Sequence, residues 1–223
     1  MEEKSFRYDA LNPNFVRITP NEYFTYRCTG CGNCCRNNRN VVMLENIDAY
    51  YLARYLNTDM TDIYSNYTEP IDIGSLLPCF TIKTVGSDDS CIFLKNNRCS
   101  IQQAKPRTCR LYPLSVEPMI NGEYRWYLCK DRHKFTPKAA RVHVKTWIKQ
   151  HFHEEDKQYY QEEIRLLPRL SSMLKKMDDR DKNIRQIIFL ILKYRYFLFD
   201  VKEPFLPQLR RNNLALLKEL KRI

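Results

Sequence analysis

Short apolar runs separated by polar loops characterise the chain from residue 15 to about residue 130. β-Branched and aromatic residues dominate these runs, which predict brief strands over 15–18, 41–44 and 79–82. Apolar side chains recur with a helical period over 46–56, and a second short helix is predicted to begin at Thr58 or Asp59. We therefore expect a small, irregular α+β module in this part of the chain.

The segment 91–101 has the pattern of a β-hairpin. Asn96-Asn97 lies between two apolar runs, where a two-residue turn requires positive φ angles that asparagine tolerates. Cys91 and Cys99 lie near the two ends of this predicted hairpin. A further strand is predicted over 124–128, directly before Cys129.

The pattern becomes helical after residue 136. Thr136-Pro137 is a favourable helix start, and Ala140 and Val144 would share the apolar face of the first helix. A second helix is predicted from about residue 155, with an interruption near Pro168 because proline removes a helical hydrogen bond.

Two more helices complete the C-terminal pattern. One is predicted from the aspartates at 178–181 to residue 199, and an amphipathic helix follows the link at 204–207. The expected fold class is α+β, with a cysteine-rich module in residues 1–135 and a mostly helical unit in residues 136–223 packed on it. A chain of 223 residues is long enough for such an arrangement.

Cysteines are the main candidates for chemistry. The chain has nine, and four of them fall within residues 28–35, where two glycines allow a tight turn. Such density indicates either a disulfide framework in a secreted protein or a thiolate metal site in a reducing compartment. The proposed ligands are Cys28, Cys31, Cys34, Cys35, Cys91, Cys99, Cys109 and Cys129.

Two observations favour metal over disulfides. The first residues are acidic and lack the apolar core of a secretory signal, which indicates a reducing compartment, and nine is an odd number for a closed disulfide set. Separately, no stretch reaches about 18 apolar residues, so no segment is expected to span a membrane. We therefore expect a cytoplasmic protein with reduced thiols and no membrane span.

The spacing of the first four cysteines leaves the metal open. Thiolates suit both Zn²⁺ and iron–sulfur clusters. Cys28, Cys31 and Cys34 resemble the start of a bacterial ferredoxin motif, but the next cysteine is Cys35 rather than the expected C-P pair three residues on. Adjacent residues are expected to point in different directions, so Cys34 and Cys35 would serve two centres. Two four-coordinate sites and one polynuclear site both remain open.

Positive charge is concentrated beside the later cysteines. The chain has a formal net charge of +11, and residues 101–150 hold 11 Lys and Arg against 3 Asp and Glu. Such a segment attracts nucleic acid, an acidic protein or an anionic cofactor, or offsets thiolate charge. Nucleic acid ranks last because no recognition-helix or zinc-finger spacing is present. The cations expected near thiolates are Arg107, Arg110, Lys130 and Arg132.

Taken together, these motifs resemble the CxxCxxCC cysteine-cluster family, also called YkgJ-like, over about residues 26–130. The residues that match the family pattern are Cys28-x2-Cys31-Gly-x-Cys34-Cys35, Cys91-x-Phe-Leu, Cys99-x-Ile and Pro106-x2-Cys109-Arg-x-Tyr-Pro. The resemblance implies chelation of zinc or iron by these cysteines, together with Cys129. Cys79 matches no family position and is interpreted as a buried free thiol. Lys105 stands where the family usually has arginine, which a bidentate contact would require.

Two functional classes follow from this resemblance. The first is a metal- or iron–sulfur-binding protein whose helical C-terminal region docks an unknown protein partner. The second is an enzyme, because one branch of the family is similar to flagellin lysine N-methylases, which use S-adenosylmethionine and an iron–sulfur centre. The chain lacks the glycine-rich strand–turn–helix of a Rossmann-type methyltransferase. Whether it is an enzyme stays open at this stage.

Overall fold

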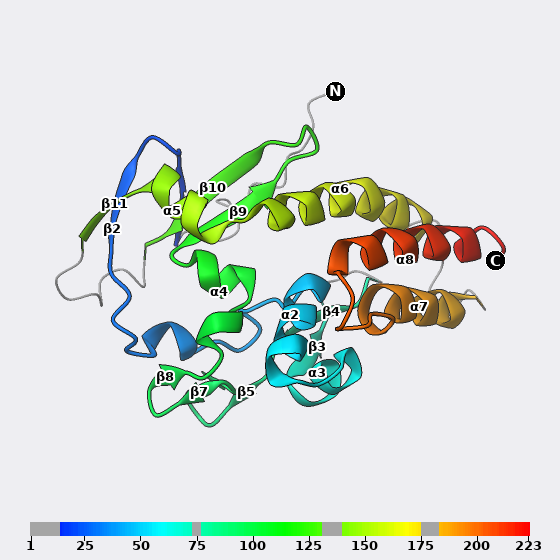
Figure 1. Cartoon of the computed structure of the whole chain (residues 1–223), viewed down its shortest axis with the longest axis horizontal. Helices are drawn as coiled ribbons and strands as arrows, with labels where there is room; N and C mark the ends of the chain where they lie inside the picture. Colours follow the sequence, from blue (N-terminus) through cyan, green and yellow to red (C-terminus); the bar gives the residue numbers. More distant parts are fainter. Residues whose placement is uncertain (1–13, 73–76, 131–139, 175–182) are drawn as a thin grey trace.

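The computed structural model describes residues 14–72, 77–130, 140–174 and 183–223. Helices and strands are mixed in the N-terminal two thirds, and helices alone follow, as Figure 1 shows. This confirms the predicted α+β class. The strands are β1 (Phe15–Ile18), β2 (Tyr23–Tyr26), β3 (Thr68–Ile71), β4 (Cys79–Ile82), β5 (Thr84–Val85), β6 (Ser90–Cys91), β7 (Leu94–Lys95), β8 (Arg98–Cys99), β9 (Leu114–Pro118), β10 (Tyr124–Cys129) and β11 (Ala140–His143).

Helices lie both among the cysteines and in the C-terminal part. They are η1 (Asn33–Cys35), α2 (Asn46–Leu56), α3 (Met60–Asn66), η2 (Gln102–Ala104), α4 (Arg107–Leu111), α5 (Val144–His151), α6 (Glu154–Leu174), α7 (Ile184–Leu192), the π-helical turn η4 (Lys193–Phe197) and α8 (Phe205–Leu220). Of these, α6 and α8 are long. In the part of the chain that the structure describes, no helix is long and apolar enough to cross a membrane.

One core lies between the first strands and α5. An antiparallel sheet of order β1-β10-β9 and the separate ladder β2–β11 carry its aromatic residues. Trp126 and Phe152 are almost fully buried there, with their ring planes at 87°. Edge-to-face packing of this kind adds to the free energy of apolar burial. The core fixes β10, at whose end Cys129 lies.

A second core surrounds α2 and α3. Tyr50 and Ile63 are buried in it, and the small ladders β3–β4, β5–β6 and β7–β8 cover it. Two aromatic residues of the C-terminal helices, Tyr159 and Phe205, belong to the same core. The helical part of the chain therefore packs directly on the part that carries the cysteines.

The third core is formed by α6, α7 and α8, which lie side by side in Figure 1. Its apolar side chains include Leu170, Ile191 and Leu216, which are fully buried. A buried ion pair, Arg195 Nη2 to Glu163 Oε2 at 2.6 Å, ties η4 to α6. Because both side chains are buried, removing either one would leave an uncompensated buried charge and strongly destabilise the fold.

The structure confirms several sequence predictions. Strands occupy 15–18 and 79–82, a helix spans 46–56, and α3 begins after Asp59, whose side chain caps it. The hairpin turn also lies at Asn96-Asn97, where φ is 50° and 60°. Cys91, however, lies outside that hairpin and pairs with Thr84 in the next ladder.

Three predictions differ from the structure. The run 41–44 forms only an isolated bridge from Met43 to Thr81 of β4, although hydrogen bonds of Val42 and Leu44 also join it to that strand. Ala140 belongs to a strand rather than a helix, since β2 offers it an open edge. Helix α6 continues through Pro168. The buried side chains Leu166, Leu170 and Leu174 keep both halves of α6 on the same core and offset the lost hydrogen bond.

Two predicted helix starts and the predicted division of the chain stay predictions. The helix starts at 136–137 and 178–181 lie outside the described residues. The proposed division at residues 135 and 136 stays a prediction. Contacts that cross it include the pairing of β11 with β2 and the burial of Tyr159 against α2.

Candidate metal centre

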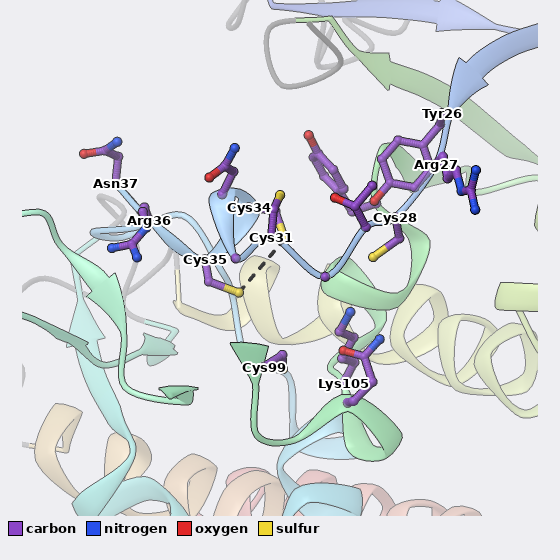
Figure 2. Close-up of a pocket in the computed structure, with 16 residues that line it drawn as sticks. Tyr26, Arg27, Cys28, Cys31, Cys34, Cys35, Arg36, Asn37, Cys99 and Lys105 are labelled. Atoms are coloured by element: carbon purple, nitrogen blue, oxygen red, sulfur yellow. Dashed lines mark hydrogen bonds between the residues drawn. The ribbon is translucent and has the colours of Figure 1, made fainter. Parts of the chain in front are cut away.

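The loop at residues 28–35 turns sharply at two glycines. Gly30 and Gly32 have φ angles of 68° and 73°, and the turn η1 follows with a hydrogen bond from the Cys35 N–H to the Gly32 carbonyl at 2.9 Å. The sulfur atoms of Cys34 and Cys35 lie 4.0 Å apart, as the dashed line in Figure 2 marks. The prediction that these neighbours point apart is wrong, because the tight turn brings both sulfurs to one side.

Polar contacts fix the second half of this loop to the neighbouring hairpins. The Asn38 side chain is buried and donates to the Cys34 carbonyl at 2.8 Å. Arg36 donates to Asp88 at 2.6 Å and to the Asn97 side chain at 2.5 Å. The sequence gives no direct signal for the contacts of Arg36, since both partners lie more than 50 residues away. Together they hold Cys34 and Cys35 against the segment that carries Cys91 and Cys99.

Two adjoining pockets contain all eight proposed ligands. The more open one has a volume of about 330 Å³, and Figure 2 shows its loop on one side with Cys99 and Lys105 on the other. The second is a cavity of about 550 Å³ that shares Cys34, Cys35 and Cys99 with the first. Cys28 and Cys31 line only the open pocket; Cys91, Cys109 and Cys129 line only the cavity; Cys34, Cys35 and Cys99 line both.

The donor set is chemically suited to zinc or iron. Cysteine sulfurs are soft ligands for both metals, and no other residue type with that preference lines the two pockets. In the described residues, no three donors are arranged around a single point as ligands of one ion. The thiols therefore line the wall of a shared space. Several of their side chains would have to move toward a metal for it to bind there.

The thiols differ in electrostatic environment. Burial raises the pKa of Cys91 and of Cys109, and neighbouring cysteines add to both effects. Cys35 and Cys99 form a hydrogen-bonded pair that lowers the pKa of Cys99, while the contacts with Cys34 and Cys99 raise that of Cys35. Cys99 is accordingly the readiest thiolate among these buried sulfurs.

Lys105 places a positive charge beside the sulfurs of both pockets. It lines both pockets, and its charge acts to lower the pKa of Cys99 and, against the larger effect of burial, that of Cys109. The predicted role of Arg107 and Arg110 beside thiolates differs from the structure, because both side chains bind carboxylates instead. Lys130 is exposed, and Arg132 lies outside the described residues.

Arg107 fixes the start of helix α4, which carries Cys109. Its side chain is 3% exposed, pairs with Glu45 and donates from Nε to Asp48 at 3.3 Å. Its backbone N–H also donates to Asp48 at 2.8 Å. The guanidinium carbon lies 4.3 Å from the ring centre of Tyr159 and 4.7 Å from that of Tyr160. The position of Cys109 thus depends on α2 and α6.

Arg110, one residue after Cys109, makes a second link to α6. Its Nη2 donates to both oxygens of Asp156, at 2.8 and 2.9 Å, and its Nη1 contacts His153 at 2.8 Å. The Asp156 side chain is 4% exposed, so this bidentate pair is largely shielded from water. Helix α4 is therefore held at both of its arginines, on either side of the cysteine.

A third link to α4 comes from α5, where the Trp147 indole donates to the Leu111 carbonyl at 2.9 Å. We expect Trp147→Phe to lower the free energy of unfolding by about 1–2 kcal/mol, because it leaves a buried carbonyl without its partner. Urea denaturation measures this loss. The exposed neighbour Lys145, changed to alanine, should stay within about 0.5 kcal/mol of the parent. Equal losses in the two variants would contradict the assigned role.

Cys79 lies apart from the other cysteines. It begins β4, is half-buried and lines neither pocket. Burial raises its pKa. The site residues that sequence reasoning missed are those that shape the pockets without being thiols. They include Tyr26, Gln102 and Asn37, which line the open pocket.

Comparison with known proteins adds one finding. The family model CxxCxxCC, described as "Putative zinc- or iron-chelating domain", matches residues 27–161, which is more than half of the chain. The match includes all the proposed ligands and extends through α5 into α6. No curated protein and no solved structure matches the chain.

Proposed function

The chain belongs to the CxxCxxCC family, and on that premise we propose that it binds iron as an iron–sulfur cluster through its clustered thiols. The observation that supports a cluster over a lone zinc ion is the number of thiols around one cavity. Six cysteines line the cavity of about 550 Å³: Cys34, Cys35, Cys91, Cys99, Cys109 and Cys129. A structural zinc ion takes four ligands close together, whereas a polynuclear cluster spans a larger space between its thiolates.

The surroundings of the cavity are consistent with this proposal. Apolar side chains such as Ile82, Ile101 and Leu114 share its wall with the sulfurs. Such a wall limits access of water, and Lys105 offsets part of the negative charge that several thiolates would bring. An iron–sulfur cluster supplies electron transfer when bound. The residues of this chain supply the thiolates, the shielding and the compensating charge.

Anaerobic purification followed by iron, sulfide and zinc analysis tests the proposal. We expect iron, acid-labile sulfide and a brown chromophore in the parent protein. Cys91→Ala and Cys109→Ala should each lose most of the iron and colour, because each removes a thiol that lines only the cavity. Cys79→Ala is the matched control and should keep both.

Two outcomes would contradict the proposal. Stoichiometric zinc in a colourless sample would show that the protein holds a structural zinc ion instead of a cluster. Full retention of iron by both Cys91→Ala and Cys109→Ala would show that the cavity does not hold the cluster. We also propose a cytoplasmic location, because cysteine thiols stay reduced, and so available as ligands, in a reducing compartment.

The enzyme alternative and the docking of a protein partner by the helical region stay predictions. Calorimetry with S-adenosylmethionine on the metal-loaded protein distinguishes the enzyme alternative from metal binding without catalysis. Binding with 1:1 stoichiometry would favour a methylase, and no heat of binding to a fully loaded sample would count against it.

A further inference from the structure

Another pocket lies between α2, α4 and the start of α6, and of the described residues none of the cysteines lines it. Its volume of about 460 Å³ is within the range of small-molecule sites. The described residue that it shares with the two cysteine-lined pockets is Lys105. Binding in this pocket, which we call the polar pocket, therefore does not depend on the proposed cluster.

Two arginines of α4 line the polar pocket, and each has one buried nitrogen without a hydrogen-bond partner among the described residues. These atoms are Arg107 Nη1 and Arg110 Nε. The other nitrogens of both side chains bind carboxylates or a histidine ring, and Arg107 is only 3% exposed. Buried N–H groups in folded proteins almost always have an acceptor, so two such groups on one pocket indicate that an acceptor binds there.

The charges of the wall favour an acceptor with a single negative charge. The ionised side chains that line the pocket are three cations and three carboxylates: Lys105, Arg107, Arg110, Asp48, Glu155 and Asp156. Asp48 and Asp156 already pair with the two arginines, and Glu155 accepts a hydrogen bond from the Tyr51 hydroxyl. The wall is formally neutral when His153 is neutral. A monoanion therefore meets less repulsion and loses less hydration there than a phosphate dianion would.

Two tyrosines give the polar pocket an aromatic wall. Tyr51 and Tyr55 are one helical turn apart on α2, line the pocket and are 37% and 44% exposed. Ile47, which is buried, lines the pocket from the same helix. A planar ring packs favourably against exposed tyrosine rings of this kind. The pocket thus combines arginine donors with a surface for an aromatic body.

We propose that the polar pocket binds a small aromatic monocarboxylate. Its carboxylate oxygens accept from Arg107 Nη1 and Arg110 Nε, and its ring packs against Tyr51 and Tyr55. A carboxylate fits these donors because its two oxygens accept charge-assisted hydrogen bonds from guanidinium groups.

Calorimetric titration of the anaerobically purified full chain with benzoate tests the proposal. We expect saturable binding with 1:1 stoichiometry. Benzamide has the same shape without the charge, and we expect it to bind about tenfold more weakly or worse. Inorganic phosphate, a dianion above neutral pH, should also bind about tenfold more weakly or worse, because the wall is formally neutral.

Variants of the wall locate the binding. Arg110→Lys keeps a cation for Asp156 but has no Nε–H, so we expect it to weaken benzoate about fivefold or more. Tyr55→Ala removes an exposed ring and should weaken benzoate about threefold or more. Arg169→Lys is the matched control, because Arg169 is exposed on α6 and does not line the pocket. It should change the affinity less than twofold, and urea denaturation of each variant checks that it is folded.

Three results would overturn the inference. The absence of saturable heat at millimolar benzoate would show that water alone satisfies the two arginine nitrogens. Equal affinities for benzoate and benzamide would show that the arginines do not bind the carboxylate. Tighter binding of phosphate than of benzoate would show a general anion site instead of a site for aromatic monocarboxylates. Because the polar pocket is separate from the cysteines, the metal content of the sample decides none of these outcomes.

Discussion

Changing Arg107 to leucine is expected to lower the free energy of unfolding by about 3–5 kcal/mol and to remove most of the iron that the proposed cluster would hold. The guanidinium is the shared partner of Glu45 and Asp48 and lies against two tyrosine rings. Leucine leaves the Asp48 carboxylate buried without its cation, and the start of α4 loses its link to α2. Denaturation in urea and iron analysis of the same sample measure the two effects.

The double variant Arg107→Leu/Asp48→Asn distinguishes a charge effect from a packing effect. Asparagine still accepts the Arg107 backbone N–H but carries no charge, so the double variant should recover about 1–2 kcal/mol of the loss. If it is less stable than Arg107→Leu alone, the pair does not act through charge.

The dependence of this loss on pH gives a second check. Burial raises the pKa of Asp48 from its ordinary value of 3.8 to about 7. Between these values the folded state binds a proton that the unfolded state has released, so the contribution of Asp48 to stability falls as the pH rises from about 4 to 7. The cost of Arg107→Leu should therefore be smaller at pH 5 than at pH 8, because protonated Asp48 has no unpaired charge.

Gly32→Ala is expected to lower the free energy of unfolding by about 2–4 kcal/mol. The residue has a φ of 73°, which disfavours a side chain, and its Cβ would lie 2.7 Å from the Asn97 carbonyl oxygen and 2.9 Å from Leu94 Cδ1. The hairpin that carries Cys99 would have to move away from the loop that carries Cys34 and Cys35. Iron content should therefore fall with stability.

Gly30→Ala is the matched control, because Gly30 has a similar φ of 68° but open space around it. Only the backbone strain remains, so we expect a loss of about 1 kcal/mol and nearly normal iron content. Equal losses at the two glycines would mean that the close contact with Asn97 does not hold the loop. A comparison of unfolding midpoints for the two variants is sufficient.

The sequence predicted local features of the site better than long-range ones. The cysteine spacing, the turn at Asn96-Asn97 and the helix over 46–56 are encoded by neighbouring residues, and the structure shows them. Neighbouring residues do not encode the partners of Arg107 and Arg36, since each arginine pairs with acidic residues more than 50 positions away. A local pattern cannot specify which of many carboxylates a buried arginine meets. Lys105 is close to Cys99 and Cys109 in the sequence, but its position alone does not show that it lines both pockets.

The C-terminal part shows a different limit. Pro168 predicted a break by local rules, but three buried leucines of α6 outweigh the lost hydrogen bond. Alanine favours a helix, and the sequence prediction for Ala140 relied on that preference. Ala140 instead forms part of a strand, because it pairs with the open edge of β2. In both cases tertiary packing overrides a local preference.

The distribution of the thiols along the chain has a consequence for biosynthesis. Cys34 and Cys35 share their pockets with cysteines as late as Cys129, and α4 is fixed by Asp156 on a helix that is synthesised later still. At about 5–20 residues per second, a ribosome needs roughly 4–15 s to extend the chain from the first cysteine cluster to Cys109. During that interval four thiols of the nascent chain lack their partners. If the proposed cluster forms, its site is complete only after α6 has been translated, and the early cysteines would have to stay reduced until then.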